Sequence, residues 1–196
     1  MNYPSGIRPK ISNINEKKNP STSMTNRGME LENDINYTNE YYLNINKAVI
    51  HKKPTPIQIV NVNYPKRSAA VITEGYFKQP STTDYNGLYK GHYIDFEAKE
   101  TNSLTSFPFN NIHEHQINHM RSILEHDGIS FFIIKFTKLD ETYLINSEFI
   151  IKLWTAQFDG GRKSVTYQCI KENGYLIPFK YPARIDYLSI LDQIYF

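Results

Sequence analysis

Three side chains that can do chemistry together, Asp84, Glu97 and Lys99, lie in one stretch, DYNGLYKGHYIDFEAKE (residues 84–100). We predict a hairpin there, in which antiparallel pairing brings Asp84 towards Glu97. Two such carboxylates repel each other unless a cation lies between them. Mg²⁺ suits the position because it prefers oxygen ligands and keeps waters, one of which can become a nucleophile. The Lys99 ammonium could orient that water or offset charge growing on a phosphate.

The second strand of this hairpin has a polar face and an apolar face. Side chains alternate along a strand, so Asp95, Glu97 and Lys99 share one face, with Glu97 and Lys99 about 7 Å apart. The other face can pack against a helix and carries Ile94, Phe96 and Ala98. We assign Asp95 no role beyond its place on the polar face. The alternative is a solvated hairpin, because an acid-x-Lys triplet recurs at residues 16–18.

The 196 residues are enough for one domain with a sizeable core. Residues 1–25 are rich in Asn, Ser, Pro and Lys and are expected to form a flexible basic arm. Residues 26–196 are expected to form the folded domain. Within it, residues 54–79 contain few large apolar side chains and suit a β-ribbon that projects from the body as a stalk.

Hydrophobic periodicity predicts a mixed α/β (α+β) fold, in which helices flank a mixed sheet. The expected helices lie near residues 26–43, 112–127 and 147–157. The expected strands lie near 48–52, 57–64, 69–77, 84–89, 92–100, 129–136 and 141–147. The run ISFFIIKF at 129–136 is apolar throughout, which is typical of a strand buried on both faces.

The formal net charge is only +2, but the charges are unevenly distributed. Residues 1–29 and 51–80 each hold five basic and one acidic residue, a net +4, whereas residues 81–128 hold three basic and seven acidic residues, a net −4. Basic segments around an acidic one are typical of an enzyme that attracts nucleic acid and holds a cation. Chance scatter in a short chain is the alternative.

The single cysteine, Cys169, allows no intrachain disulfide and no cysteine-rich zinc site. This pattern favours a reducing, cytoplasmic location. We find no apolar run of the roughly 18 residues needed to cross a bilayer, so no membrane partner is expected.

Several stretches identify the chain as similar to a known family. Asp84 followed by Glu97-Ala98-Lys99 resembles the split active site of the PD-(D/E)xK nucleases, whose restriction-endonuclease-like fold the resemblance implies. Longer stretches, over roughly residues 26–196, resemble the RecU family of Holliday-junction resolvases. These stretches are NRGMELE, AVIHKKPTPIQIV, YPKRSAAVI, YFKQPSTTDYNG, YIDFEAKET, FPFNNIHEHQ, ENGYLIPF and IDYL.

The resemblance implies the site residues. It assigns Mg²⁺, with Mn²⁺ as a substitute, to Thr82, Asp84, Glu97 and Gln116, and makes Lys99 a stabiliser of the transition state. Thr83 precedes Asp84 where the wider superfamily has proline, a departure that RecU proteins share. Without the resemblance, Thr82 is an ordinary turn residue and Gln116 an ordinary residue of a helix surface.

The resemblance also implies a crossover junction endodeoxyribonuclease that acts as a homodimer. Two symmetric sites would nick two strands of a four-way junction during recombination and repair. It further implies contacts with the RecA recombinase and the RuvAB branch-migration proteins. The alternatives are a sequence-specific restriction-type endonuclease, and a non-catalytic factor that anneals DNA or regulates a recombinase.

Basic and aromatic residues in and beside the predicted stalk are candidates for DNA contact. Lysine and arginine can bind phosphates, and exposed aromatic rings can stack on bases at the branch point. The candidates are Lys52, Lys53, Lys66, Arg67, Tyr76, Phe77 and Lys78. The alternative is a solvated edge ribbon whose lysines deter aggregation.

Three histidines of the 112–127 helix raise the question of zinc. His115 and His119 are four residues apart on one helical face, with His113 beside them. No third ligand has an obvious spacing, so a polar helix face near DNA is preferred. Glu30 could point from the first helix to the site, but a favourable interaction with the helix dipole is simpler.

Overall fold

The computed structural model describes residues 29–66, 69–78 and 82–196. The predicted arm at 1–25 lies outside these ranges, as does the start of the first predicted helix. Among the described residues, no helix is long and apolar enough to cross a membrane.

The core of the molecule is one six-stranded mixed sheet with the strand order β1-β4-β5-β7-β8-β10. Neighbouring strands are antiparallel except β5 and β7, which are parallel and are joined through α2. The sheet strands are β1 (Val49–Lys52), β4 (Tyr85–Tyr89), β5 (His92–Thr101), β7 (Ile129–Phe136), β8 (Glu141–Asn146) and β10 (Tyr175–Leu176). A separate pair consists of β6 (Ser106–Pro108) and β9 (Ser164–Thr166).

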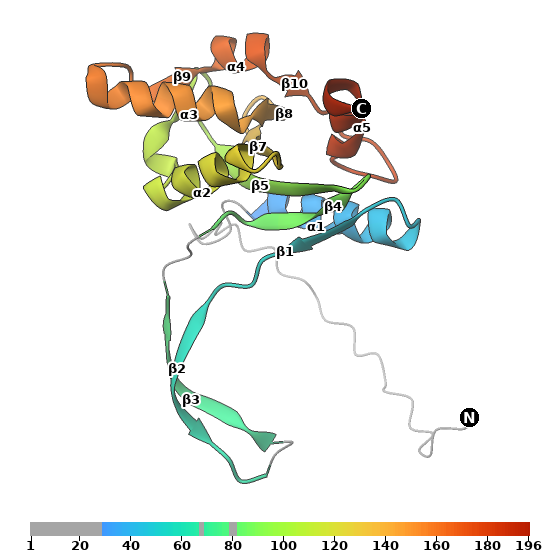
Figure 1. The fold of residues 1–196 in the computed structure, drawn as a ribbon, viewed down its shortest axis with the longest axis vertical. Helices are drawn as coiled ribbons and strands as arrows, with labels where there is room; N and C mark the ends of the chain where they lie inside the picture. The colour runs from blue at the N-terminus through green and yellow to red at the C-terminus, as the bar shows by residue number, and fades with distance from the viewer. Residues whose placement is uncertain (1–28, 67–68, 79–81) are drawn as a thin grey trace, which may run out of the picture.

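Helices cover both faces of the sheet (Figure 1). One face packs against α1 (Met29–Asn44) and α5 (Tyr187–Tyr195). The other packs against α2 (Glu114–Glu125), α3 (Ser147–Ala156) and α4 (Tyr167–Asn173). Short 3₁₀ helices lie at Phe109–Asn111 and Gln157–Asp159. The predicted mixed sheet flanked by helices is therefore confirmed.

Strand β7 explains how the two cores are held together. All eight of its residues are buried, as its apolar run predicts, because helices lie on both sides. Phe131 and Ile133 face the core formed with α1 and α5, whereas Phe132 and Ile134 face the core formed with α2 and α3. Since β5 pairs with β7 along its length, the predicted catalytic strand is fixed between both cores.

The apolar face of β5 is anchored by aromatic stacking. The Phe96 ring stacks between those of Tyr85 and Phe131, with centroids 4.8 Å away on each side. Each such pair contributes about 0.5–1.5 kcal/mol beyond the area it buries. These contacts fix the face of β5 that carries Phe96 and thereby the direction of the opposite, polar face.

The β4–β5 hairpin sets the register of the site. Lys90 and Gly91 both have positive φ (48° and 81°), as a tight two-residue hairpin turn requires. The register pairs Tyr85 with Phe96, so the preceding residue, Asp84, comes opposite Glu97. The pairing predicted from the sequence is the observed one.

The remaining strands, β2 (Ile57–Asn63) and β3 (Val71–Phe77), form a two-stranded ribbon. Figure 1 shows this ribbon lying away from the sheet and its helices. Every described residue of β3 is exposed, and in β2 only Val62 is partly buried. The ribbon therefore has no core of its own, as its composition indicates.

The C-terminal segment is more structured than the sequence indicated. The last of the expected helices and strands ends near residue 157, whereas the structure also has β9, α4, β10 and α5 beyond that point. Tyr187 and Leu188 are completely buried against the sheet face that α1 also covers. The C-terminal helix α5 is thus part of the core that also contains α1.

Candidate active site

The five residues that the resemblance assigns to chemistry line one cavity of about 540 Å³, here called the ligand cavity. These residues are Thr82, Asp84, Glu97, Lys99 and Gln116. They come from three places: the segment before β4, strand β5, and the first turn of α2. The fold therefore brings together residues up to 34 positions apart in the sequence.

Glu97 is the centre of this arrangement. Its side chain is completely buried, and its Oε1 accepts hydrogen bonds from Lys99 Nζ at 2.6 Å and Gln116 Nε2 at 2.5 Å. Its Oε2 accepts from the backbone N–H of Asp84 at 3.1 Å. The Asp84 carboxylate in turn accepts from the backbone N–H of Ala98 at 3.4 Å. The two acids are thus interlocked across the β4–β5 pair.

Burial raises the pKa of Glu97 to about 8, because the charged carboxylate loses its hydration. The Lys99 ammonium opposes this shift, whereas the Asp84 carboxylate adds to it. The raised pKa is therefore mainly an effect of burial. A cation placed beside Glu97 would favour its charged form.

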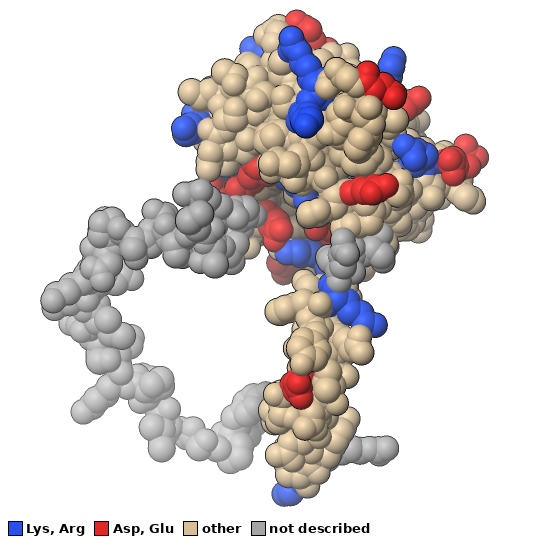
Figure 2. All heavy atoms as spheres, turned by 90° about the vertical axis from the view of Figure 1, so that its left-hand side faces the viewer, with Lys and Arg blue, Asp and Glu red and all other residues tan. Residues whose placement is uncertain are grey.

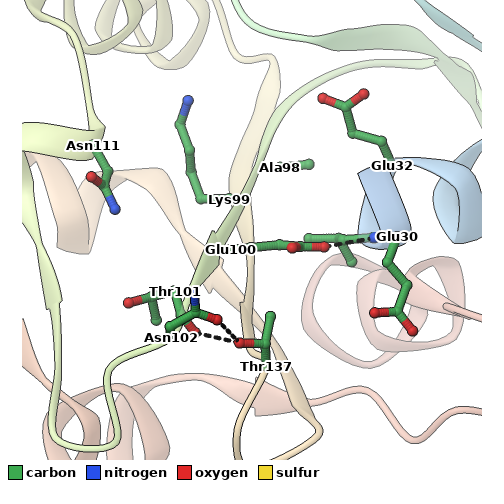
Figure 3. A pocket seen from close by; sticks show the side chains of 10 residues that line it. Glu30, Glu32, Ala98, Lys99, Glu100, Thr101, Asn102, Asn111 and Thr137 are labelled. Carbon is green, nitrogen blue, oxygen red and sulfur yellow. Dashed lines mark hydrogen bonds between the residues drawn. The ribbon is translucent and has the colours of Figure 1, made fainter. Parts of the chain in front are cut away.

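A second cavity, of about 640 Å³, shares Lys99 and Glu32 with the ligand cavity. Figure 3 shows Glu100 directed towards the start of α1, where its Oε1 accepts from the backbone N–H of Leu31 at 2.7 Å. Glu30 points away from Lys99 in the same view, and its carboxylate lies 3.6 Å from Lys135. Glu30 lines this cavity and not the ligand cavity.

Gln116 reaches the site because of the way α2 begins. Its Oε1 accepts from the backbone N–H of His113 at 3.0 Å, which forms a capping box at the helix N-terminus. Its Nε2 then points at Glu97. The amide oxygen is engaged in the cap, so direct metal ligation by Gln116 would require that oxygen to leave the His113 N–H.

The residues fit a hard divalent cation. Two carboxylates and the Thr82 side chain offer oxygen atoms, which Mg²⁺ prefers over nitrogen or sulfur. Among the described residues there is no group of three or more His, Cys, Asp and Glu residues with metal-binding geometry.

Two lysines predicted to bind phosphate have carboxylate partners at the rim of the ligand cavity. Lys52 pairs with Glu32 at 2.5 Å, and Lys53 pairs with Asp95 at 2.7 Å. Figure 2 shows acidic and basic side chains gathered where the ribbon joins the body. Phosphate contact by these lysines remains a prediction.

The other candidates for DNA contact lie on the ribbon. Tyr76 and Phe77 have 61% and 80% of their surface exposed, which leaves their rings accessible for stacking. Lys66 lies at the ribbon tip and Lys78 at its base, both exposed. Arg67 lies outside the described residues.

Sequence reasoning missed Asp95 and Glu32. Asp95 is completely buried and accepts hydrogen bonds from Lys53, Thr83 and Tyr93. Glu32, in the first turn of α1, lines both cavities. The signal for Asp95 was present in the strand alternation, which put it on the polar face of β5.

Comparisons with known proteins address which family this chain belongs to. A family model described as RecU, recombination protein U, matches residues 26–193. The Holliday junction resolvase RecU of Oceanobacillus iheyensis is 59% identical over 196 residues, covering 100% of both chains. That of Geobacillus kaustophilus is 55% identical, covering 100% of this chain and 98% of the relative.

Among solved structures, Hjc, a Holliday junction resolvase of Archaeoglobus fulgidus, matches with a TM-score of 0.44 and 8% identity, over 75% of this chain and 93% of that one. The family match over most of the chain and the two full-length relatives show that this chain belongs to the RecU family.

Proposed function

We propose that this protein is an Mg²⁺-dependent endonuclease that resolves Holliday junctions. The observation that carries the proposal is the ligand cavity, where Asp84, Glu97 and Lys99 meet in a chain of the RecU family. Its curated relatives with 55–59% identity are named Holliday junction resolvase. Mn²⁺ is expected to substitute for Mg²⁺, since it accepts similar oxygen ligands.

Each residue of the cavity has a proposed role. Asp84, Glu97 and Thr82 hold the ion through oxygen atoms, and Gln116 fixes Glu97 by the hydrogen bond from its Nε2. When bound, Mg²⁺ supplies the Lewis acidity that polarises the scissile phosphate. Lys99, whose Nζ lies 2.6 Å from Glu97, offsets the charge that grows on the phosphate oxygens in the transition state.

The proposal extends to how the enzyme engages the junction. A homodimer would carry two cavities, one for each strand to be nicked, and the ribbon would reach the branch point. The exposed Tyr76 and Phe77 rings support a stacking role for the ribbon. Contacts with RecA and RuvAB rest on the family resemblance alone.

A cleavage assay on a synthetic mobile four-way junction tests the mechanism. Asp84→Asn removes a ligand charge, and Lys99→Ala removes the ammonium, so we expect each to lower the single-turnover rate with Mg²⁺ by about 10²–10⁴-fold. Junction binding, measured in Ca²⁺, should be retained. Asp140→Asn is the matched control, since that carboxylate is 91% exposed and outside the cavity.

Other outcomes would favour the alternatives. Undiminished cleavage by both variants would contradict the proposed roles. Cleavage of linear duplex as fast as that of the junction would favour a restriction-type endonuclease. Junction binding by the wild-type protein without cleavage in Mg²⁺ or Mn²⁺ would favour a non-catalytic recombination factor.

A further inference from the structure

Asp95 is the completely buried carboxylate on β5 that the proposed mechanism does not use. Its Oδ2 lies 2.7 Å from Lys53 Nζ, 3.0 Å from the Tyr93 hydroxyl and 3.2 Å from His119 Nε2. Its Oδ1 accepts a hydrogen bond from the Thr83 hydroxyl. Lys53 Nζ also donates to Thr83 Oγ1 at 2.9 Å, which closes the network.

The partners of Asp95 come from three separate segments. Lys53 directly follows β1 and leads into the ribbon, Thr83 lies between the ribbon and β4, and His119 lies on α2. Asp95 therefore joins both ends of the ribbon to the strand that carries Glu97. It also joins that strand to the helix that carries Gln116.

Two of these segments hold residues of the proposed site next to the contact. Thr83 lies between Thr82 and Asp84, and His119 lies one helical turn after Gln116. The backbone N–H of Lys53 donates to the Asp84 carbonyl at 2.7 Å, so both the side chain and the backbone of Lys53 fix the Asp84 segment. The network thus sets where the ligands lie relative to one another.

Asp95 is placed to act through these neighbours and not on the substrate. It does not line the ligand cavity, and both of its oxygens already accept from protein donors. A buried ion pair is a poor source of stability, because desolvation of both charges offsets their attraction. A better explanation for the buried Asp95 carboxylate is that it fixes the positions of the three segments relative to β5.

We propose that Asp95 is a positioning residue, which holds Lys53, Thr83 and His119 so that the ribbon base, Asp84 and Gln116 are aligned on Glu97. This inference rests on the proposed nuclease function. It gives Lys53 a different role from phosphate binding: its side chain is 19% exposed and serves to align the site.

The test separates the cleavage step from junction binding in three variants. Asp95→Asn keeps the shape but removes the charge, Lys53→Met removes the ammonium, and Thr83→Val removes the bridging hydroxyl. Single-turnover cleavage at saturating enzyme with Mg²⁺ gives the rate, and binding of the same junction in Ca²⁺ over a series of salt concentrations gives the affinity. Thermal midpoints report folding.

We expect Asp95→Asn and Lys53→Met to lower the saturating rate by about 100-fold, since a misplacement of about 1 Å can have that effect. The dissociation constant and its salt slope should stay within about threefold of wild type, because no phosphate contact is lost. The double variant Asp95→Asn, Lys53→Met should cleave no more slowly than Asp95→Asn alone, because the two residues act through one shared interaction. Thr83→Val should show a smaller loss of rate. If Asp95→Asn does not fold, the saturating rate of Thr83→Val tests the positioning role in its place.

Asp34→Asn is the matched control. Asp34 is also buried and paired, with Arg184 at 2.9 Å, but on the opposite face of the sheet. We expect it to lower the thermal midpoint and to leave the saturating rate unchanged. An equal loss of rate in Asp34→Asn would show that destabilisation alone explains the effect.

Two further outcomes would overturn the inference. A wild-type saturating rate in Asp95→Asn and Thr83→Val would remove the positioning role. Weaker binding with a shallower salt slope and an unchanged saturating rate in Lys53→Met would establish phosphate contact instead. If the wild-type protein itself cleaves no junction, the proposed function fails first, which is a separate result.

Discussion

Glu141 shows how a single residue ties an outer helix to the sheet. Its Oε2 accepts hydrogen bonds from the hydroxyls of Tyr143 at 2.6 Å and Tyr167 at 2.7 Å. Tyr167 is the first residue of α4, so this carboxylate links α4 to β8. The two hydroxyls stabilise the charged form and lower the pKa of Glu141 below its ordinary value.

We predict that Glu141→Gln removes an acid-sensitive part of the stability. A carboxylate with a lowered folded-state pKa stabilises the fold above its unfolded pKa, and this contribution is lost as the pH falls through the folded pKa. At pH 7 the variant should be less stable by about 1 kcal/mol, after screening by solvent. The difference should shrink towards pH 3 in urea unfolding curves. Glu125→Gln, at an exposed site, should show no such trend; a constant difference in Glu141→Gln would contradict the prediction.

Glu97 and Asp95 show which site residues the sequence can reveal. Strand alternation and hairpin pairing, both local rules, predicted that Glu97 would meet Asp84, and the observed register confirms it. The contacts of Asp95 with Lys53 and His119 span 42 and 24 residues. They depend on how the ribbon base and α2 pack on the sheet, which no local pattern specifies.

At the scale of elements, the ribbon and the C-terminal helices differ in how well the sequence predicted them. The β2 and β3 strands followed from alternation and turn residues, and their exposure from the scarcity of large apolar side chains. The helices α4 and α5 have only seven and nine residues. A helix of two turns gives too few repeats to recognise, so tertiary packing decides its formation.

We predict that Phe77→Ala weakens junction binding without affecting folding. The ring is 80% exposed at the end of β3, so its removal should change the unfolding free energy by less than about 0.5 kcal/mol. Loss of one stacked base is worth about 1–3 kcal/mol, or roughly 5–150-fold in the dissociation constant. Fluorescence anisotropy with a labelled four-way junction measures the change.

The control for Phe77→Ala is Ile59→Ala, an apolar truncation on the same ribbon at a side chain that is 52% exposed. It should leave the dissociation constant within about twofold of wild type, because an aliphatic side chain has no ring to stack on a base. Equal weakening in both variants would mean that the ribbon's shape, and not the aromatic ring, determines affinity.

At the scale of the whole molecule, strands β5 and β7 join the two cores to the ligand cavity. Strand β5 contributes Phe96 to one core and pairs along its length with β7, which contributes to both. Its polar face meanwhile supplies Glu97 and Lys99 to the cavity. A cation held by Asp84 and Glu97, as proposed, would contact the segment before β4 as well as β5, and so would hold together parts of the fold that separate on unfolding. Binding of Mg²⁺ should therefore stabilise the entire domain.

We predict that Mg²⁺ raises the thermal midpoint of the wild-type protein and not that of Glu97→Gln. A ligand that binds only the folded state at one hundred times its dissociation constant adds about 2.7 kcal/mol. For a domain of this size that corresponds to roughly 5–10 °C, measurable by scanning calorimetry. Sodium chloride at matched ionic strength controls for general screening, which acts on both proteins alike. An equal shift in the variant would mean that the ion binds elsewhere on the molecule, because the substituted amide retains the shape of the Glu97 side chain but lacks the charge that the cation requires.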